Sequence, residues 1–416
     1  MAGRRTIDNI LSVLNKMTDA RYKVYIIGLL FTIGITLKEV LGSSYNNFQI
    51  FSYGSIDFWN GINPYSDWAH FGLRGNTLDK YLYGPVFSIL FTPFTFLPGW
   101  ISVFLWNIFT YTLFFFSVFT LPDKFSFVKK RFIFFYSVLL LFATLLSVQF
   151  NPVVAAIFMF SFTLLEINRG FWAVLLILIS GFTKLYGIFQ AIMLLFYPKF
   201  RRNTGYAIII GIGFIFLPLV MIPADELAAY YQSWVVRLTD HFNALNRYSI
   251  YRPIGLIYNS FEPYMGYISL GVLGLISVFA LLKLKLFKAF FSYRAQFLGI
   301  LMSWAILFGV GSEKHTYVIA VAGYAIWYLC ITPNRFDKVL LWTNLILLGV
   351  LPIDLLCPYV ISKFILTKLN LGIIVFSITW MVMVYKTFFS SQSITDLKVL
   401  SEESGSTLSG DKTVSV

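Results

Sequence analysis

Charged residues are scarce in this chain. Only 12% of its 416 residues are Asp, Glu, Lys or Arg, and 58% are hydrophobic, whereas an ordinary soluble domain carries roughly a quarter charged residues. A soluble core cannot bury so much apolar surface. Apolar stretches long enough to cross a hydrocarbon layer about 30 Å thick recur along the chain between basic or polar clusters. The sequence therefore predicts an all-α, polytopic integral membrane protein.

Cysteine and histidine are also scarce, with two and three residues respectively. Cys330 and Cys357 fall near opposite ends of different predicted spans, so the limit of about 7 Å between Cα atoms excludes a disulfide between them. The outer histidines and acidic residues lack the spacing of zinc ligands. The sequence therefore predicts no cofactor, although outer carboxylates leave room for a hard divalent cation.

Basic residues outnumber acidic ones and give a net charge of +13. They lie between apolar spans rather than on one face or arm, which argues against a nucleic-acid partner. They accumulate in alternate connections, and such connections lie in the cytoplasm. No small-residue cleavage site follows the first span, so an uncleaved signal anchor is expected. The predicted divisions are a cytoplasmic basic segment (1–23), one membrane domain (24–388) and a polar cytoplasmic tail (389–416).

About twelve apolar segments are candidate membrane-spanning or half-spanning helices. One long segment is broken by Pro93 and Pro98. The pair between residues 171 and 198 is too short for two full spans, so a helical hairpin with Lys184 near its turn is predicted. The segments are 24–42, 86–121, 132–149, 152–166, 171–183, 185–198, 205–222, 264–282, 295–310, 316–332, 339–357 and 371–387.

The connections opposite the cytoplasm hold the unusual polar residues. Two of them, 43–85 and 223–263, are long and rich in aromatic residues, so we expect them to be ordered. In the first loop, aromatic rings suit stacking on sugars and amides suit bonding to hydroxyls, while the alternative is an interfacial aromatic belt. Its candidate substrate-binding residues are Asn46, Asn47, Tyr65, Tyr81 and Tyr83.

Two further outer turns carry candidate residues. Gln149 and Asn151, in VQFNP, could recognise hydroxyls or phosphate, or could cap helix ends. Lys184 lies within an apolar hairpin, where a charge costs about 2.5–3.5 kcal/mol at the membrane centre. That cost favours a functional role over snorkelling to the outer surface.

The second outer loop retains Arg237, His241, Arg247 and Arg252 on the side where cations are disfavoured. They indicate an anionic ligand, because Arg forms bidentate charged hydrogen bonds with phosphate. The alternative is pairing with Asp225, Glu226, Asp240 and Glu262. Trp234 of the same loop is a candidate substrate-binding residue.

The short segment GSEKH places three ionisable residues, Glu313, Lys314 and His315, between two spans. A carboxylate beside a lysine and an imidazole suits a general base next to a phosphate clamp. The alternative is a solvated ion pair. Together with the earlier features, this predicts a site for a donor phosphate at Lys184, Arg237, Arg252, Lys314 and His315.

Several fragments occur in an order and spacing that are fairly specific in combination: IFSYGSIDFWNGINPY, LYGPVFSILFTPFTFLP, QFNPVVAAIF, GFTKLYGIF ahead of KFRR, and SEKHTYVIAVAGYAIWYL. Over most of its length the chain thereby resembles glycosyltransferase family 87, membrane enzymes of the C-type glycosyltransferase fold. The resemblance implies inverting transfer of a hexose, mannose in the best-known members, from a polyprenyl phosphate. The acceptor would be an envelope glycan or glycolipid at the outer face of a bacterial plasma membrane.

One position departs from the family pattern. Upstream of the Gly61-x-x-Pro64-Tyr65 element the pattern carries an aspartate, and this chain has Asn47. An amide cannot act as a general base, so the resemblance leaves Glu313 and Asp57 as the candidate catalytic carboxylates, or an inactive protein or a different acceptor chemistry.

The leading hypothesis is therefore a glycosyltransferase with a polyprenyl phosphate sugar as donor. The runner-up is a non-catalytic flippase for lipid-linked glycans, or a scaffold of envelope assembly. A flippase should need polar groups along a path through the membrane, whereas these cluster at one surface. An ion-coupled transporter would need buried intramembrane charges, which the spans almost lack.

Overall fold

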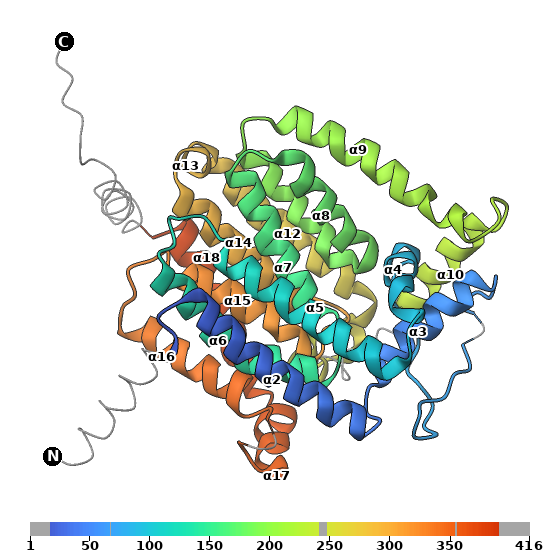
Figure 1. Cartoon of the computed structure of the whole chain (residues 1–416). Coiled ribbons are helices and arrows are strands. Elements are labelled where there is room, and N and C mark those ends of the chain that lie inside the picture. Colours follow the sequence, from blue (N-terminus) through green and yellow to red (C-terminus); the bar gives the residue numbers. More distant parts are fainter. Residues whose placement is uncertain (1–16, 67, 241–247, 354–355, 391–416) are drawn as a thin grey trace.

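The computed structural model describes residues 17–66, 68–240, 248–353 and 356–390. Within these residues every regular element is a helix, and the β-type contact is an isolated bridge between Phe71 and Thr77. The all-α prediction is therefore confirmed (Figure 1).

The helices follow one another along the chain with short connections except at the two long loops. The first part holds α2 (Arg21–Leu41), α3 (Asn46–Trp59), α4 (Pro85–Phe91), η1 (Thr92–Thr95), α5 (Gly99–Phe119), α6 (Phe127–Leu146), α7 (Asn151–Glu166), α8 (Gly170–Thr183), η2 (Leu185–Phe196), α9 (Phe200–Phe216) and η3 (Leu217–Val220). The second part holds α10 (Leu227–Asp240), α11 (Tyr251–Gly255), η5 (Asn259–Tyr264), α12 (Met265–Leu282), α13 (Leu284–Ala289), α14 (Phe291–Leu307), η6 (Lys314–Thr316), α15 (Tyr317–Tyr328), α16 (Arg335–Asn344), η7 (Leu345–Val350), α17 (Tyr359–Lys363), η8 (Phe364–Lys368) and α18 (Leu371–Phe388).

Each predicted apolar segment falls on helical structure. The long segment is interrupted where Pro93 and Pro98 were expected to break it, because proline cannot donate the hydrogen bond that continues a helix. Pro85 and Pro152 instead stand in the first turns of α4 and α7, where that donor is not needed. The predicted hairpin is formed by α8 and η2, with Lys184 at its turn.

Among the described residues, five helices are long and apolar enough to cross a membrane: Arg21–Leu41, Gly99–Phe119, Phe200–Val220, Glu262–Leu282 and Leu371–Phe388. Several other apolar helices are shorter, α7, α8 and η2 among them. The protein is thus an integral membrane protein, and the number of complete spans is lower by this criterion than the number of predicted segments.

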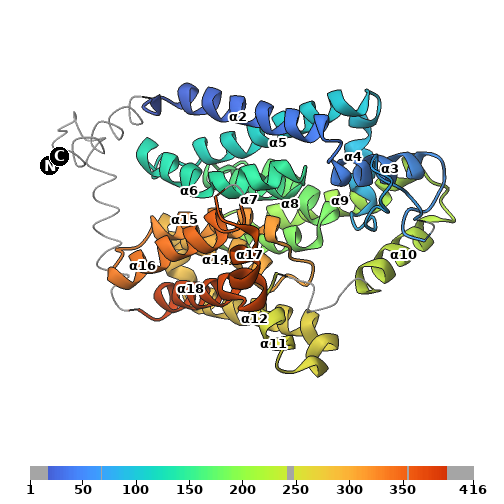
Figure 2. The ribbon, with the colours of Figure 1, turned by 90° about the horizontal axis from the view of Figure 1, so that it is seen from below.

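The core lies where α14 and α15 pack together in the middle of the bundle, between α6 and α7 on one side and α18 on the other (Figure 2). The backbones of α14 and α15 are very close, since a Cβ atom on Gly299 would lie 2.4 Å from the Gly323 carbonyl oxygen. Small residues at such crossings are typical of membrane helices. By contrast, α9 lies at the periphery, and Asn203 is its buried residue.

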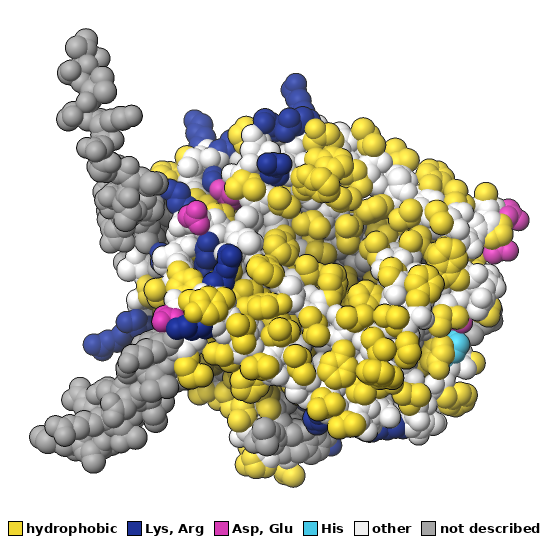
Figure 3. Space-filling view, viewed as in Figure 1, with side chains coloured by type: hydrophobic (Ala, Val, Ile, Leu, Met, Phe, Trp, Pro, Cys, Tyr) yellow, Lys and Arg dark blue, Asp and Glu magenta, His cyan; other side chains and the backbone are white. Residues whose placement is uncertain are grey.

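The surface is largely apolar between two polar ends. In Figure 3 the Lys and Arg side chains gather toward the end of the molecule that carries α13 and α16, and hydrophobic side chains cover most of the visible face. The two long loops lie at the opposite end, around α3 and α10 (Figure 1). The basic connections and the long loops thus occupy opposite ends of the bundle.

The described parts of the two long loops are folded and pack on each other. Asn63 Nδ2 donates to Ser233 Oγ at 3.2 Å, Trp234 Nε1 donates to the Leu82 carbonyl at 3.1 Å, and Arg237 Nε donates to the Tyr65 carbonyl at 2.6 Å. These bonds join α10 to the first loop.

Candidate functional site

The turn between α6 and α7 displays three polar side chains of the site. Val148, at its centre, is fully buried and has a φ of 48°, a left-handed conformation that is strained for a β-branched residue. Such strain persists only where surrounding structure imposes it, and it occurs preferentially at functional sites. The turn presents Ser147, Gln149 and Asn151 toward the neighbouring connections.

A chain of hydrogen bonds runs from Lys184 to Glu313. Lys184 Nζ donates to Asn151 Oδ1 at 2.8 Å, Asn151 Nδ2 donates to Gln149 Oε1, and Gln149 Nε2 donates to Glu313 Oε2 at 3.0 Å. The two amides are buried, whereas the Glu313 side chain is exposed. The neutral amides of Asn151 and Gln149 therefore connect the Lys184 ammonium to the Glu313 carboxylate, and the two charged groups form no direct ion pair.

The first long loop supplies an aromatic ring to this lysine. Lys184 Nζ lies 5.1 Å from the centroid of the Tyr83 ring, a cation–π distance. Gly84 allows this approach, because its backbone N–H donates to the Thr183 carbonyl and a Cβ atom there would lie 2.1 Å from the Phe182 oxygen. Burial lowers the pKa of Lys184, in the turn between α8 and η2, to about 8, and Glu313 opposes this shift.

The connection between α14 and α15 faces the same turn. Its Glu313 N–H donates to Thr316 Oγ1 at 3.1 Å, which fixes the start of η6. His315 Nε2 lies 3.0 Å from Ser147 Oγ, and Asn47 Nδ2 donates to the Ser147 carbonyl at 2.7 Å. Burial lowers the pKa of His315, Glu313 partly opposes this, and Lys314 adds to the lowering, which favours the neutral imidazole.

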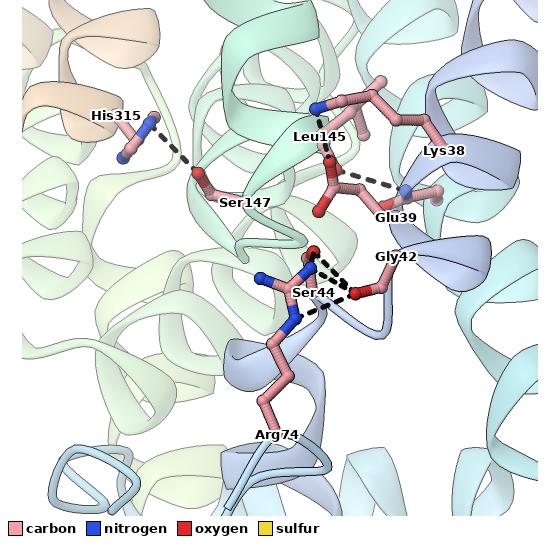
Figure 4. A network of polar contacts seen from close by, with 9 residues as sticks. Lys38, Glu39, Gly42, Ser44, Arg74, Leu145, Ser147 and His315 are labelled. Carbon is pink, nitrogen blue, oxygen red and sulfur yellow. Dashed lines mark hydrogen bonds and ion pairs between the residues drawn. The ribbon is translucent and has the colours of Figure 1, made fainter. Parts of the chain in front are cut away.

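Figure 4 shows the surroundings of the Ser147–His315 contact. The end of α2 lies beside it with Lys38, Glu39 and Gly42, and Arg74 reaches Gly42 and Ser44 from the first long loop. Glu39 is 5% exposed and accepts a bond from Lys38 Nζ at 3.0 Å. A buried carboxylate therefore lies near the His315 side of the site.

A second group of cations lies beyond Glu313. Lys314 Nζ is 5.5 Å and the Arg252 guanidinium carbon is 5.6 Å from the centroid of the Tyr248 ring. Tyr248 Oη lies 3.1 Å from Thr367 Oγ1, and Arg252 Nη2 donates to the Thr367 carbonyl at 3.5 Å. The residues expected to form one phosphate site are thus divided: Lys184 and His315 lie near the α6–α7 turn, Arg252 and Lys314 lie at Tyr248, and Arg237 is bonded to the Tyr65 carbonyl.

At this end of the bundle some side chains are suited to binding an anion, and another is suited to accepting a proton. Cations without direct carboxylate partners suit an anion, and an exposed carboxylate suits acceptance of a proton from a bound hydroxyl. In the described residues no group of three or more His, Cys, Asp or Glu side chains is arranged to hold a metal ion. The arrangement is suited to group transfer between a phosphate ester and a hydroxyl.

A sequence model of glycosyltransferase family 87 matches residues 81–358, about two thirds of the chain. The chain belongs to glycosyltransferase family 87. No curated protein and no solved structure matches it. The resemblance noted in the sequence is therefore confirmed, and family membership makes the protein a glycosyltransferase with a sugar donor and an acceptor.

The family match covers Lys184, the α6–α7 turn and the Glu313 segment. It begins at Tyr81, so the departure expected at Asn47 lies outside the matched residues. Asn47 nevertheless contacts the site, because it bonds to the Ser147 carbonyl.

Several predicted residues form the framework of the outer loops. Tyr65 is buried and its hydroxyl donates to the Tyr83 carbonyl at 2.7 Å, Tyr81 is buried with its hydroxyl 2.7 Å from Ser88 Oγ, and Trp234 is buried against Leu82. Asn46 Oδ1 is buried and has no hydrogen-bond partner. Of the predicted tyrosines, Tyr83 is the one that contacts Lys184.

Asp57 lies in a different environment from Glu313. It is 4% exposed, and its Oδ2 is 2.7 Å from His70 Nε2. The imidazole of His70 stacks on Tyr53 with centroids 4.4 Å apart. Asp57 therefore orients His70 within the first loop rather than joining the chain of bonds to Lys184.

Other predicted features stand outside the part of the chain that the structure describes. His241 and Arg247 lie in 241–247, and no contact of theirs is described. Sequence reasoning missed Ser147, Tyr248, Glu39 and His70. Of these residues only Glu39 could have been selected from the sequence, because the Lys38–Glu39 pair ends an apolar span, where charged residues cost free energy.

Proposed function

We propose that this family 87 protein transfers a hexose, of mannose type, from a polyprenyl phosphate sugar to a hydroxyl of an envelope glycan or glycolipid, with inversion. Lys184 binds the donor phosphate, and Glu313 is the general base. The chain of bonds from Lys184 through Asn151 and Gln149 to Glu313 is the observation that carries the proposal.

The proposed reaction is a single displacement. The acceptor hydroxyl loses its proton to Glu313 while its oxygen bonds to the anomeric carbon from the face opposite the phosphate. The bond from that carbon to the phosphate oxygen breaks, and the polyprenyl phosphate leaves with the electron pair. Its charge rises from one to two negative charges, so the ammonium of Lys184 stabilises the transition state more than the ground state.

The surrounding residues support these two roles. Tyr83 covers Lys184 and suits stacking on the donor sugar, and Gln149 and Asn151 hold the lysine and the carboxylate in register. The lowered pKa of His315 favours its neutral form, and its Nε2 lies 3.0 Å from Ser147 Oγ, which suits a hydrogen-bonding role toward a substrate hydroxyl or phosphate. Arg237 uses its N–H groups on the Tyr65 carbonyl, so the mechanism assigns it to loop docking.

The proposed location is a bacterial plasma membrane with this end of the bundle on the extracytoplasmic side. The basic connections at the opposite end support this orientation. Single cysteines replacing the exposed residues Glu226 and Lys285 test it, since the native Cys330 and Cys357 are buried. In intact cells a membrane-impermeant maleimide should label Glu226→Cys and leave Lys285→Cys unlabelled. The reverse pattern would exclude the orientation.

Transfer itself is tested with the purified protein in nanodiscs. Radiolabelled mannose, glucose and arabinose donors on a short polyprenyl phosphate are incubated with a membrane extract that contains acceptors. We expect label to move from one donor into an organic-soluble or glycan product, and Glu313→Gln to reduce this transfer by about 100-fold or more. Absence of transfer from all three donors would reject the enzymatic proposal, and label transfer undiminished in Glu313→Gln would reject the assigned base.

A further inference from the structure

A short hairpin, residues 70–78, lies within the first long loop. At its base the Leu78 N–H donates to the His70 carbonyl at 3.0 Å, and at its tip the Gly75 N–H donates to the Gly72 carbonyl at 2.8 Å. Gly75 has a φ of 75°, a left-handed conformation that glycine adopts without strain. The hairpin is therefore a defined structure with a tight turn at its tip.

Two polar contacts hold this hairpin on α3. At its base His70 Nε2 lies 2.7 Å from Oδ2 of the buried Asp57, and near its tip the Leu73 N–H donates to Gln49 Oε1 at 3.3 Å. Asp57 and Gln49 are both on α3. The contacts lie at both ends of the hairpin, so its position relative to α3 is fixed along its length.

A third contact joins the hairpin to the end of a membrane-spanning helix. Arg74 Nε donates at 2.9 Å to the carbonyl of Gly42, which directly follows α2 (Figure 1). The 21 residues of α2 are apolar enough to cross a membrane. At about 1.5 Å per residue they extend over about 30 Å, the thickness of the hydrocarbon layer. The end of α2, and the hairpin bonded to it, therefore lie at the level of the membrane surface.

Two apolar side chains of the hairpin are exposed. Phe71 is 62% and Leu73 is 56% exposed, although the backbone of Leu73 is bonded to α3. Leu41, the last residue of α2, is 77% exposed. The apolar surface of the hairpin thus continues the lipid-facing surface of α2. Phe and Leu side chains at this level are typical of segments that lie in the boundary between headgroups and acyl chains.

We propose that the 70–78 hairpin inserts Phe71 and Leu73 into the headgroup region of the adjacent leaflet and holds the first long loop at a fixed depth. Continuity with α2 favours the bilayer over a protein partner as the occupant of this surface. Because α3 also carries Asn47, which bonds to the Ser147 carbonyl, the hairpin connects the membrane surface to the α6–α7 turn. This proposal does not depend on glycosyl transfer.

The depth of the hairpin is measured on the full chain in phosphatidylcholine nanodiscs. A single cysteine that carries the fluorophore NBD replaces Phe71 or Leu73, so that the other apolar side chain remains. The native Cys330 and Cys357 are buried. Phosphatidylcholine with a nitroxide near the carbonyl end of its acyl chain quenches from within the leaflet, and iodide quenches from water.

The reference positions are Leu41→Cys for lipid and Glu226→Cys for water, both exposed. The lipid nitroxide should quench the labels of Phe71→Cys and Leu73→Cys at least about threefold more strongly than the label of Glu226→Cys, and about as strongly as that of Leu41→Cys. Quenching by iodide alone would overturn the proposal. Protection from both quenchers would also overturn it, because a protein surface would then cover the hairpin.

The contact with α2 is tested in the Leu73→Cys chain. Arg74→Gln removes the charged bond to the Gly42 carbonyl and should reduce quenching by the lipid nitroxide at least about twofold. The matched control is Lys80→Gln, which removes an exposed cation just outside the hairpin and should leave the quenching unchanged. Equal quenching in Arg74→Gln and Lys80→Gln would overturn the role of Arg74 in setting the depth.

Discussion

Buried cations are partnered differently at the two ends of the bundle. At the basic end Arg294 pairs directly with Glu166, at 2.6 Å from Nε and 2.9 Å from Nη2, and Tyr197 donates to the same carboxylate at 2.6 Å. Lys386 pairs directly with the buried Asp337. At the opposite end Lys184 contacts an amide and a tyrosine ring.

Cations in direct ion pairs stabilise the fold, whereas a cation that contacts only neutral groups can bind an anionic ligand. A direct pair between buried groups is satisfied within the protein, and loss of one partner leaves an uncompensated charge. A lysine held by neutral groups keeps most of its charge for a ligand. Burial of such a cation costs free energy, and Lys184 lies at the end of the bundle that carries the long loops.

Removal of a carboxylate from the basic end should have the largest effect on stability. Glu166→Ala leaves Arg294 charged, largely buried and unpaired, and should lower the free energy of unfolding by about 3–5 kcal/mol. Denaturant titration in mixed micelles measures it. A change below about 1 kcal/mol would show that Arg294 does not need a carboxylate partner for stability, as we expect for the cations at the outer end.

Substitution of Glu313, the carboxylate at the outer end, should affect activity strongly and stability little. Glu313→Gln should reduce kcat by about 100- to 1,000-fold, because it removes the proposed base but keeps a side chain that can bond to Gln149. Its unfolding free energy should change by less than about 1 kcal/mol. The exposed Glu226→Gln serves as a control with normal kcat, and a fall in kcat below tenfold in Glu313→Gln would contradict the role.

Lys184→Gln should weaken use of the donor. Loss of a charged hydrogen bond to phosphate costs about 1.5–3 kcal/mol, so the KM for the donor should rise by about 10- to 100-fold. The kcat should fall as well, because the ammonium is proposed to stabilise the transition state more than the ground state. The KM for the acceptor should change little. Steady-state kinetics with each substrate varied in turn test this. Equal rises in the donor KM and the acceptor KM would show that Lys184 does not act on the donor alone.

The activity should depend on pH through the same lysine. Because the pKa of Lys184 is lowered to about 8, the side chain is charged below that pH and loses its charge as pH rises through it. The kcat/KM for the donor should then fall about tenfold per pH unit above pH 8. Lys184→Arg should retain its charge and lack this decrease, so an unchanged alkaline limb in that variant would assign it to another group.

The smallest effect should come from the other candidate carboxylate. Asp57→Asn keeps an acceptor for His70, and kcat should stay within about threefold of the unmodified chain. A loss of 100-fold or more would transfer the base assignment from Glu313 to the Asp57–His70 pair. Comparison of the two amide variants therefore decides between the carboxylates.

Much of the helical architecture could be predicted because it depends on local properties. The segment around Pro93 and Pro98, the α8–η2 hairpin and the order of the other apolar helices follow from span length and backbone hydrogen bonding. The number of complete spans could not be predicted, since short helices such as α7 and α8 are buried by neighbours rather than by lipid alone.

Individual candidate residues could be selected from the sequence, but their arrangement in space could not be predicted. Lys184 and Glu313 could be selected individually because ionisable groups among apolar segments are costly. The division of the predicted phosphate residues into a Lys184 place and a Tyr248 place could not be inferred, nor could the structural role of Arg237 at Tyr65. These depend on contacts between segments far apart in the chain.

The amino-acid sequence by itself determined a helical membrane bundle, the separation of basic from other polar connections, and family membership, because hydrophobic length, charge distribution and sequence pattern are local properties. Only the tertiary structure decided which cations lack carboxylate partners. The α6–α7 turn and the Glu313 segment meet through packing of α6, α7, α14 and α15, and that packing places two amides between Lys184 and Glu313.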